Sequence, residues 1–517
     1  MNTMALWRST FIVSAMTMLS RVLGLVRDMV LLNVFGAGKD FDTFVVAFRI
    51  PNFFRRLFAE GAFSQAFIPV LTEYKTSKLH AEVQILISRV FGCLLVVMTS
   101  LTVLCMVIAP AILYIYAPGF HNDPLKFDLA VDLFRLTIPY LLFMSLTAFA
   151  SSILNSYGSF TTPAFAPVLL NITMIAGAWW LSPYMAEPIM ALGWAVVVAG
   201  ILQLALQIPE LWRKKLLIPP KVDFKHEGVE RILKLMLPAL FGVSVTQINL
   251  LLNTIWASFM QDGSVSWLYT AERMTELPLG LIGVAIGTVI LPALSMRKAE
   301  QDQNKFKDML DWAARVIVFA GIPASIALFM LSTPIIQALF QHGAFSLHDT
   351  QMTALALQCM SAGVLAFMLI KVFAPGFYAI QDTKTPVRVG LMAVAANAIL
   401  NVILINFFKY IGWQEQHMAL AIASSGSALV NAGMLYFYLH KRNIFRFGSH
   451  WKMLFVQFII GNLVMVAALW YGLTWYDGTL APWLRVLEVI GLCVLGVVAY
   501  AMGLLISGFR PRHLKHS

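Results

Sequence analysis

Long apolar stretches recur along the whole chain, separated by shorter segments rich in charged residues. Many of these stretches reach the about 20 residues that a helix needs to cross the hydrocarbon core of a bilayer. No stretch alternates apolar and polar residues with the period of two that strands of a membrane barrel require. The pattern therefore predicts an all-α, polytopic membrane protein.

Segmentation by hydropathy predicts about fourteen transmembrane helices, with ends placed to within several residues. The expected helices cover approximately residues 9–35, 41–70, 88–113, 127–156, 162–182, 187–211, 232–259, 264–296, 309–335, 347–380, 385–407, 416–440, 451–472 and 482–508.

Short motifs recur at a constant offset of 223 residues: Ala66-Phe-Ile-Pro-Val-Leu71 aligns with Val289-Ile-Leu-Pro-Ala-Leu294, and Ser159-Phe-Thr-Thr-Pro163 aligns with Asp382-Thr-Lys-Thr-Pro386. We therefore expect two six-helix lobes in parallel repeat plus two C-terminal helices, with a substrate site where the lobes meet. The expected parts are an N-terminal lobe (1–212), a cytoplasmic linker (213–231), a C-terminal lobe (232–445), and helices 13 and 14 with a cytoplasmic tail (446–517).

Composition supports the membrane class, because 59% of the residues are hydrophobic and only 12% are charged, at a mean hydropathy of +0.77. The net charge of +11 is unevenly placed. With the N-terminus in the cytoplasm, the outer connections carry only Lys39, Lys126, Lys409 and Arg485, and the other loop cations are inside. This bias predicts that both termini are cytoplasmic, and it makes the basic excess a topology signal rather than a sign of nucleic-acid binding.

Catalytic and metal chemistry have little support. The four cysteines lie in apolar segments without a Cys-x-x-Cys pair, and the histidines lie in or beside loops. No loop is long enough to fold as a catalytic domain. The sequence therefore predicts a protein that is not an enzyme and has no metal and no cofactor.

The most informative residues are arginines placed within apolar segments, where a guanidinium costs at least about 2.5–3.5 kcal/mol at mid-bilayer. They are Arg21, Arg27, Arg49, Arg55, Arg56 and Arg273. Cations at such depth normally face a water-filled cavity, and the natural occupant of a cationic cavity is an anion. Arginine also binds phosphate oxygens through two parallel hydrogen bonds. We therefore predict a transporter for an anion, with Arg21, Arg27, Arg55 and Arg273 facing the substrate.

Helix geometry adds detail to this constellation. Arg21 and Asp28 share a helical face, whereas Arg27 points about 120° away on an ideal helix. Gly24 lies between them and permits a bend. Pro51 removes one backbone hydrogen bond, which predicts a kink near the middle of the second helix.

Some of the charges have a structural interpretation. Arg56 and Glu60 are four residues apart, as in an intrahelical ion pair. Arg49 and Glu272 occupy equivalent positions of the two repeats and could pair across their interface.

Five motifs of the chain are distinctive: Ser20-Arg-Val-Leu-Gly-Leu-Val-Arg-Asp28, Phe35-Gly-Ala-Gly38, Pro51-Asn-Phe-Phe-Arg-Arg-Leu-Phe-Ala-Glu-Gly-Ala-Phe-Ser-Gln-Ala-Phe-Ile-Pro69, Pro163-Ala-Phe-Ala-Pro167 and Ala374-Pro-Gly-Phe-Tyr378. Together they resemble the motifs of the MurJ (MviN) family of lipid II flippases. The resemblance covers essentially the whole chain. It implies membership in the multidrug/oligosaccharidyl-lipid/polysaccharide exporter superfamily.

The resemblance further implies a multi-pass protein of the bacterial inner membrane that acts in peptidoglycan biosynthesis, cell-wall biogenesis and cell shape. Its substrate would be lipid II, the undecaprenyl-pyrophosphate-linked disaccharide pentapeptide, flipped from the cytoplasmic to the periplasmic leaflet by alternating access. Membrane lipids and the cell-wall synthesis machinery would be its other partners. Helices 13 and 14 would form a groove for the polyprenyl tail.

By motif match, two sets of residues acquire expected roles. The substrate-binding set is Ser20, Arg21, Arg27, Arg55, Arg273 and Glu276. The cavity acids or gate residues are Asp28, Asp42, Glu60 and Glu272. Some members have a sodium site with acidic ligands in the C-terminal lobe, but the predicted helices 232–259 and 385–407 contain no Asp or Glu. The sequence therefore gives no support for that sodium site, and it does not decide whether transport is coupled to sodium or to protons.

Other functions remain as alternatives. The nearest is export of another polyprenyl-linked glycan. A drug–cation exporter would favour acids over arginines in its cavity. A polyprenyl-phosphate glycosyltransferase would need carboxylates on a large external loop, and a non-transporting scaffold would not need buried arginines.

Overall fold

The computed structural model describes residues 3–59, 62–299, 302–448 and 450–510. Within these ranges the protein is helical and has no strand, which confirms the predicted all-α class. Contacts divide the chain into two compact units, Met1–Val265 and Ser266–Ser517.

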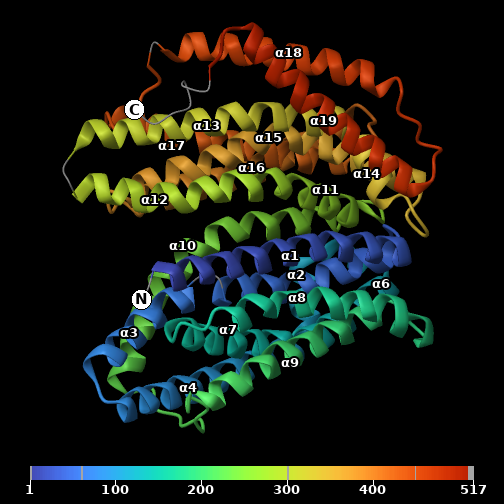
Figure 1. The fold of residues 1–517 in the computed structure, drawn as a ribbon. Helices are drawn as coiled ribbons and strands as arrows, with labels where there is room; N and C mark the ends of the chain where they lie inside the picture. The colour runs from blue at the N-terminus through green and yellow to red at the C-terminus, as the bar shows by residue number, and fades with distance from the viewer. Residues whose placement is uncertain (1–2, 60–61, 300–301, 449, 511–517) are drawn as a thin grey trace. The chain divides into compact units, whose positions relative to one another are not determined.

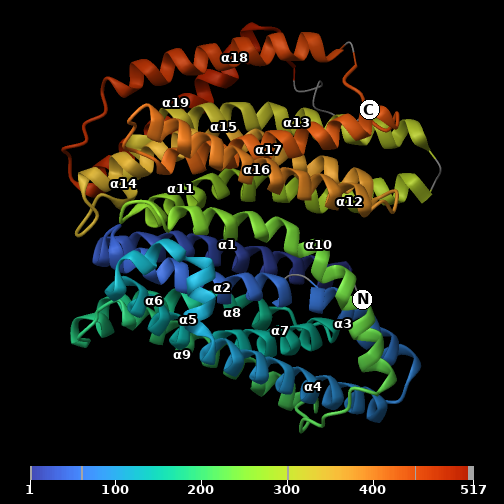
Figure 2. The ribbon, with the colours of Figure 1, turned by 180° about the vertical axis from the view of Figure 1, so that it is seen from behind.

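In the first unit, α8 packs between α1 and α9, and α2 contacts α6 and α7 (Figure 1). The N-terminal part of α10 lies along α3 (Figure 2). The main helices are α1 (Thr3–Phe35), α2 (Lys39–Ala59), α3 (Ala62–Ser77), α4 (His80–Val107), α5 (Ala109–Tyr116), α6 (Pro124–Thr137), α7 (Tyr140–Ser156), α8 (Thr161–Ala176), α9 (Met190–Arg213) and α10 (Glu227–Ala257). Short 3-10 or π turns are η1 (Pro118–Asn122), η2 (Gly177–Leu181) and η3 (Ser182–Tyr184).

In the second unit, α15 lies between α13 and α17, and α18 packs along α19 (Figure 1). A core around Met368, Phe373 and Trp451 joins α15 to α18. The helices are α11 (Ser264–Pro278), α12 (Val284–Ala299), α13 (Gln303–Met330), α14 (Ser332–Phe340), α15 (Leu347–Tyr378), α16 (Lys384–Tyr410), α17 (His417–Lys441), α18 (His450–Leu473) and α19 (Pro482–Ile506), with the π-helical η4 (Leu279–Gly283) between α11 and α12.

The helix bounds repeat with the offset found in the sequence. Both ends of α13 follow those of α4 by 223 residues, and α10, α14 and α17 occupy the corresponding places of α1, α5 and α9 to within a few residues. Helix α16 corresponds to α8 together with η2 and η3. The unit boundary falls later than the repeat boundary, because α10 opens the second repeat yet packs on α2, α3 and α4. The predicted division into lobes at 212 and 232 describes the repeat and stays a prediction.

Prolines change some of the predicted helices. The segment expected as one helix over 127–156 is divided into α6 and α7 at Ile138-Pro139, whereas its repeat counterpart α15 is continuous. Proline explains the difference, since its ring removes a backbone donor and clashes with the preceding turn. In contrast, α2 runs through Pro51. The helix predicted over 41–70 covers α2 and most of α3, which lie on either side of residues 60–61, outside the described ranges. The kink predicted at Pro51 therefore does not interrupt the helix.

Ten segments within the described ranges are long and apolar enough to cross a membrane. The other four predicted spans fall on α1, α2 with α3, α10, and α11 with α12, which include the segments that carry the charged constellation. The predicted count of about fourteen is therefore not confirmed, although long helices occupy all of the expected places.

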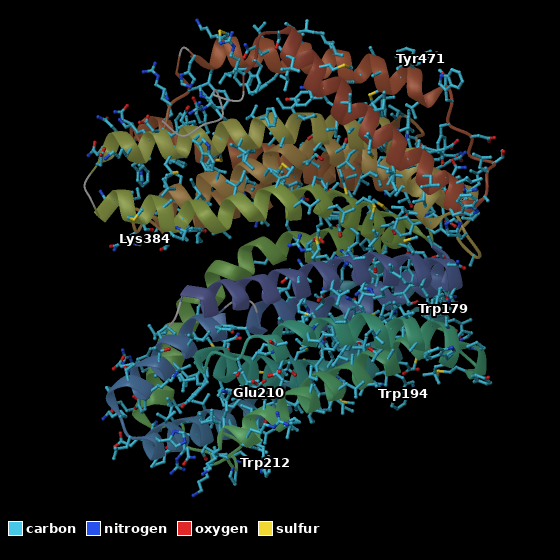
Figure 3. The ribbon with its side chains drawn as sticks, in the orientation of Figure 1. Trp179, Trp194, Glu210, Trp212, Lys384 and Tyr471 are labelled. Carbon is cyan, nitrogen blue, oxygen red and sulfur yellow. The ribbon has the colours of Figure 1, made fainter. Side chains whose placement is uncertain are left out.

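Exposed aromatic side chains lie toward both ends of α9, as Figure 3 shows for Trp194 and Trp212, which are 48% and 72% exposed. Trp179 in η2 and Tyr471 in α18 are exposed as well. Tryptophan and tyrosine are enriched where a protein meets the two membrane–water interfaces. The exposed apolar surface therefore fits a bilayer rather than water.

Candidate functional site

The most deeply buried arginine of the predicted set is Arg27, which is 7% exposed. Its Nε and Nη2 atoms donate to Oδ1 of Asp28 at 3.0 and 2.6 Å, and Nη1 donates to Oδ1 of Asn171 in α8 at 3.0 Å. Asn171 in turn donates to the backbone carbonyl of Ser20 at 3.0 Å. A buried guanidinium needs such partners, because an uncompensated charge away from water is costly. Arg27 therefore links α1 to α8.

Arg21 has a different environment from Arg27. It is exposed, as are its helix neighbours Met18 and Val22 at 53% each, while Ser20 is half-buried. The face of α1 that carries Arg21 is therefore open within the first unit, whereas the face that carries Arg27 is closed.

On α2, Arg55 is half-buried and its Nε atom donates to Oδ1 of Asn52 at 2.8 Å. Arg49 reaches α10, where its Nη1 atom donates to Oγ1 of Thr254 at 2.5 Å and to the carbonyl of Leu250 at 3.3 Å. Arg56 is also half-buried. Helix α2 therefore presents several cations that water can still reach.

Asp42, near the start of α2, is 1% exposed and belongs to a polar cluster around the α10–α11 connection. Its Oδ2 atom accepts a hydrogen bond from the backbone N–H of Gly263 at 2.8 Å and lies 3.6 Å from the Lys126 ammonium. Lys126 also pairs with Asp262 at 2.5 Å and lies 4.2 Å from the centre of the Phe120 ring. One buried lysine thus bridges two carboxylates, one on each side of the contact.

A second contact holds the same connection. The backbone N–H of Gly119 donates to Oγ of Ser258 at 3.0 Å, and a Cβ at Gly119 would overlap the Ser258 backbone. Nearby, Lys39 pairs with Asp123 at 2.6 Å, and this hydrogen bond lowers the pKa of the Asp123 carboxyl below its ordinary value. We call the contacts of Asp42, Gly119 and Lys126 with residues 258–263 the external latch, because the distribution of loop cations predicts that this end faces the periplasm.

In the second unit, α11 carries Arg273, Glu276 and Glu272. Nη1 of Arg273 lies 3.1 Å from Oε2 of Glu276, one helical turn away, with side chains 30% and 44% exposed. Glu272 is half-buried. This pair is partly solvated, which leaves the guanidinium able to exchange its partner for another anion.

The structure therefore brings together Ser20, Arg27, Asp28 and Asn171 at one place, Asp42 and Lys126 at another, and Arg273 and Glu276 at a third. Glu60 lies outside the described residues, so the predicted pair of Arg56 with Glu60 has no structural description. The predicted pair of Arg49 with Glu272 would join the two units and stays a prediction.

Sequence reasoning overlooked Lys126 as part of these clusters. From the sequence, Asn171 is a residue that could line the cavity or bond across helices, and the structure shows it bonded to Arg27 and to the Ser20 carbonyl of α1. Lys126 was counted among the external loop lysines, yet it is 5% exposed. Its partner Asp262 is 136 residues away in the chain, and Asn171 is 144 residues from Arg27. No local pattern indicates such pairs. No group of three or more His, Cys, Asp and Glu side chains in the described part of the chain is placed to hold a metal ion.

Comparison with known proteins gives a consistent result. The family described as "Lipid II flippase MurJ" matches residues 31–490. A "Probable lipid II flippase MurJ" from Vibrio cholerae is 44% identical over 99% of this chain and 98% of its own length. A "Lipid II flippase MurJ" from Burkholderia cenocepacia is 39% identical over 99% of both chains.

Solved structures agree with these relatives. One described as "Lipid II flippase MurJ, inward closed conformation" has a TM-score of 0.79 and 28% identity, covering 95% of this chain and 98% of its own. An inward-facing multidrug resistance MATE family transporter of the MOP superfamily has a TM-score of 0.65 at 13% identity, covering 83% of this chain and 98% of its own. At that identity the second likeness concerns the fold alone.

Proposed function

The chain belongs to the MurJ family of lipid II flippases, and we propose that it flips lipid II from the cytoplasmic to the periplasmic leaflet by alternating access. It is a transporter rather than an enzyme. The observation that carries the proposal is the set of permanently charged guanidiniums within the helices of a membrane protein, which includes the exposed Arg21 and the half-buried Arg55 and Arg273. Such groups are costly in lipid and suit an anionic cargo.

In the proposed site, Arg21, Arg27, Arg55 and Arg273 bind the pyrophosphate and its headgroup, with Ser20 and Glu276 beside them. Arg55 donates to the neutral Asn52, and Arg273 pairs with the partly solvated Glu276, so a pyrophosphate can replace these partners. Arg27 is compensated by Asp28 and orders α1 against α8. The polyprenyl tail would stay in lipid along α18 and α19.

The external latch supplies the gate for this cycle. In the conformation described, Asp42, Gly119 and Lys126 hold residues 258–263, so this connection must separate from the first repeat when the opposite end closes. Asp42 is thereby a gate residue rather than a ligand of the cargo. The proposed orientation has both termini in the cytoplasm, following the positive-inside bias of the loops. Cell-wall synthesis enzymes are proposed partners.

The test is reconstitution of the purified protein with lipid II and with a different polyprenyl-pyrophosphate glycan in separate vesicles. Lipid II should be flipped faster. Arg55→Ala and Arg273→Ala should each slow flipping at least about tenfold, since one charge-assisted hydrogen bond is lost. Lysine at these positions should recover only part of the rate, because it keeps the charge without the fork.

Arg135→Ala is the matched control. Arg135 is an exposed arginine of α6 whose Nη1 atom lies 3.9 Å from Asp132, and its loss should leave flipping unchanged. Full activity of the two alanine variants would remove the anion-site argument. Preferential flipping of the other glycan would favour the second candidate function, export of a different polyprenyl-linked saccharide.

A further inference from the structure

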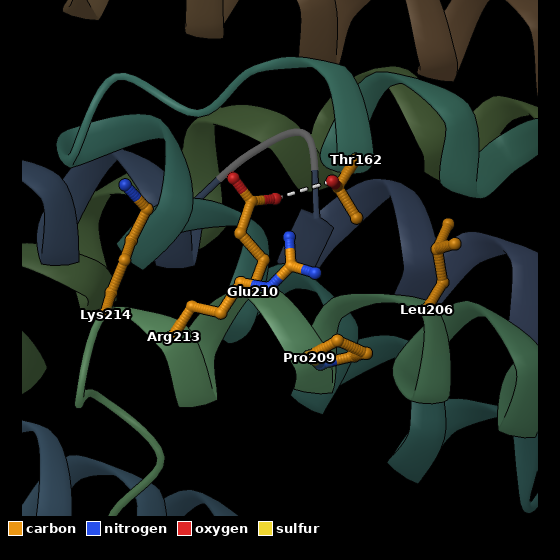
Figure 4. Close-up of a pocket in the computed structure, with 6 residues that line it drawn as sticks. All are labelled: Thr162, Leu206, Pro209, Glu210, Arg213 and Lys214. Atoms are coloured by element: carbon orange, nitrogen blue, oxygen red, sulfur yellow. Dashed lines mark hydrogen bonds between the residues drawn. The ribbon is translucent and has the colours of Figure 1, made fainter.

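A pocket outside the arginine constellation lies where α8 begins and α9 ends. It has a volume of about 440 Å³ and is lined by Thr162, Leu206, Pro209, Glu210, Arg213 and Lys214 (Figure 4). Pockets for small ligands commonly enclose about 300–1,000 Å³. The lining combines an apolar wall with charges of both signs, and the proposed function uses none of these residues.

The acidic group in the pocket is Glu210. Its Oε2 atom accepts a hydrogen bond from the Thr162 hydroxyl at 2.5 Å, and the carboxylate lies between the side chains of Thr162 and Lys214 in Figure 4. No ion pair joins Glu210 to a cation within the described residues. The carboxylate therefore keeps its capacity to bind a cationic donor.

Arg213 and Lys214 supply the positive side of the pocket. Cations at the end of a helix are ordinarily explained by the helix dipole, which favours them there. The same dipole disfavours the Glu210 carboxylate, which lies within the last turn of α9. Hydrogen bonds from Ser159 and Thr162 and the charges of Arg213 and Lys214 offset this cost for Glu210. The acid and the two cations can also receive a ligand that carries both charges.

The location indicates the source of such a ligand. Trp212 beside the pocket is 72% exposed, as expected of a side chain at a membrane–water interface. Leu206 and Pro209 form the apolar wall, which suits the glycerol and first carbons of a lipid. The Arg213-Lys214-Lys215 run follows α9 directly on the predicted cytoplasmic side, where basic residues attract lipid phosphates.

We propose that this pocket binds the headgroup of an aminophospholipid, a phosphate ester with a primary ammonium, from the cytoplasmic leaflet. Arg213 and Lys214 hold the phosphate, and Glu210 accepts hydrogen bonds from the ammonium. This site is distinct from that of the transported cargo, and its occupancy does not require that the cargo be lipid II.

The headgroup series tests the proposal on the unaltered protein. The delipidated full-length protein is mixed with phosphatidylethanolamine, phosphatidylcholine or phosphatidylglycerol of identical acyl chains, and bound lipid is counted by native mass spectrometry. Phosphatidylethanolamine should bind about tenfold more tightly than the other two, because only its headgroup offers positively charged N–H donors to the carboxylate. Equal binding of the three lipids would overturn the proposal.

Two variants locate the site. Glu210→Gln should abolish the preference for the ethanolamine headgroup over the glycerol headgroup, while binding of the phosphate persists. Arg213→Gln combined with Lys214→Gln should weaken the binding of all three lipids. The matched control is Glu230→Gln with Lys234→Gln, an exposed ion pair of α10 with the same charges. This control should leave the binding of all three lipids unchanged. An ethanolamine preference that survives in Glu210→Gln would place the binding elsewhere and refute the assignment.

Discussion

Arg21 and Arg27 lie on the same helix with the same charge, but their surroundings give them different roles. Arg21 is exposed, whereas Arg27 is buried with Asp28 and Asn171. Both are proposed to bind the anionic headgroup. Only Arg27 also maintains the packing of α1 on α8, so loss of transport and loss of stability should separate at these two positions.

We predict that Arg27→Ala lowers the free energy of unfolding by about 3–5 kcal/mol, because it leaves the buried Asp28 carboxylate without its partner. Arg21→Ala should cost no more than about 0.5 kcal/mol, as is usual for an exposed side chain. Denaturant unfolding of both variants in detergent measures the difference. Replacing Arg27 and Asp28 together by leucine should restore stability without restoring flipping. Equal stability of the two single variants would contradict the role of Arg27 in packing.

Asp382, between α15 and α16, provides a prediction about pH. Burial raises the pKa of its carboxyl, but hydrogen bonds from Thr385 and Arg442 outweigh burial and lower the pKa from 3.8 to about 2. Its contribution to stability is therefore complete above pH 3.8 and is lost as the pH falls through about 2. Asp382→Asn should destabilise the protein by about 1 kcal/mol at neutral pH, after allowance for partial exposure.

The measurement for Asp382 is the unfolding midpoint in detergent at a series of pH values. The difference between the wild-type protein and Asp382→Asn should shrink as the pH approaches 2. Asp302→Asn is a useful comparison, because the Asp302 carboxyl also accepts hydrogen bonds at a helix start but its side chain is more exposed than that of Asp382. A constant difference at every pH would exclude the proposed ionic contribution of Asp382.

At the scale of elements, the contact of the α10–α11 connection with the first repeat is the feature most relevant to transport. The external latch combines a hydrogen bond to backbone, a buried lysine between two carboxylates, and a glycine that permits close approach. Contacts of this kind can form and separate as a unit, whereas a packed apolar core resists small displacements.

Gly119→Ala should weaken the external latch, because the added Cβ would overlap the backbone of Ser258, which cannot move aside as a flexible side chain would. Opening of the external latch can be measured with a cysteine introduced at Ser264, because this position is only 1% exposed while the contact is closed. We expect a membrane-impermeant maleimide to label this cysteine faster in the Gly119→Ala background. Gly38→Ala is the control, since a Cβ there meets no atom within 4 Å. Unchanged labelling in Gly119→Ala would argue against a gate at this place.

At the scale of the whole molecule, the described residues form two repeats of corresponding helices. We propose that an inside-negative membrane potential gives the transport its direction. It favours outward movement of an anion by about 2.3 kcal/mol per charge per 100 mV if the full field is crossed. Movement of the arginines with the cargo would reduce this value.

Flipping in vesicles should accordingly accelerate when an inside-negative potential is imposed and slow when the potential is collapsed by an ionophore. Sodium and proton gradients, varied separately at constant potential, identify any coupling ion. A flipping rate that is the same with and without the potential would exclude the membrane potential as the driving force and would leave ion coupling in its place.

The sequence by itself determined the helical class, the places of the long helices and the repeat. These follow from local properties, because in lipid a chain must satisfy its backbone hydrogen bonds within each segment and needs a fixed apolar length. The sequence also indicated the proposed anion site, because arginines within apolar helices are rare and costly. Helix breaks were less predictable: Pro139 interrupts a helix and Pro51 does not.

Only the tertiary structure decided which partners the charged side chains bind. Arg27 donates to Asn171 in α8, and Lys126 lies between Asp42 and Asp262. Glu210 in α9 accepts a hydrogen bond from Thr162 at the start of α8. These partners are far apart in the chain, and their pairing depends on how the helices pack. The energy of a buried charge is set by the atoms that surround it in space, so residue type and spacing reveal the charge but not its partner.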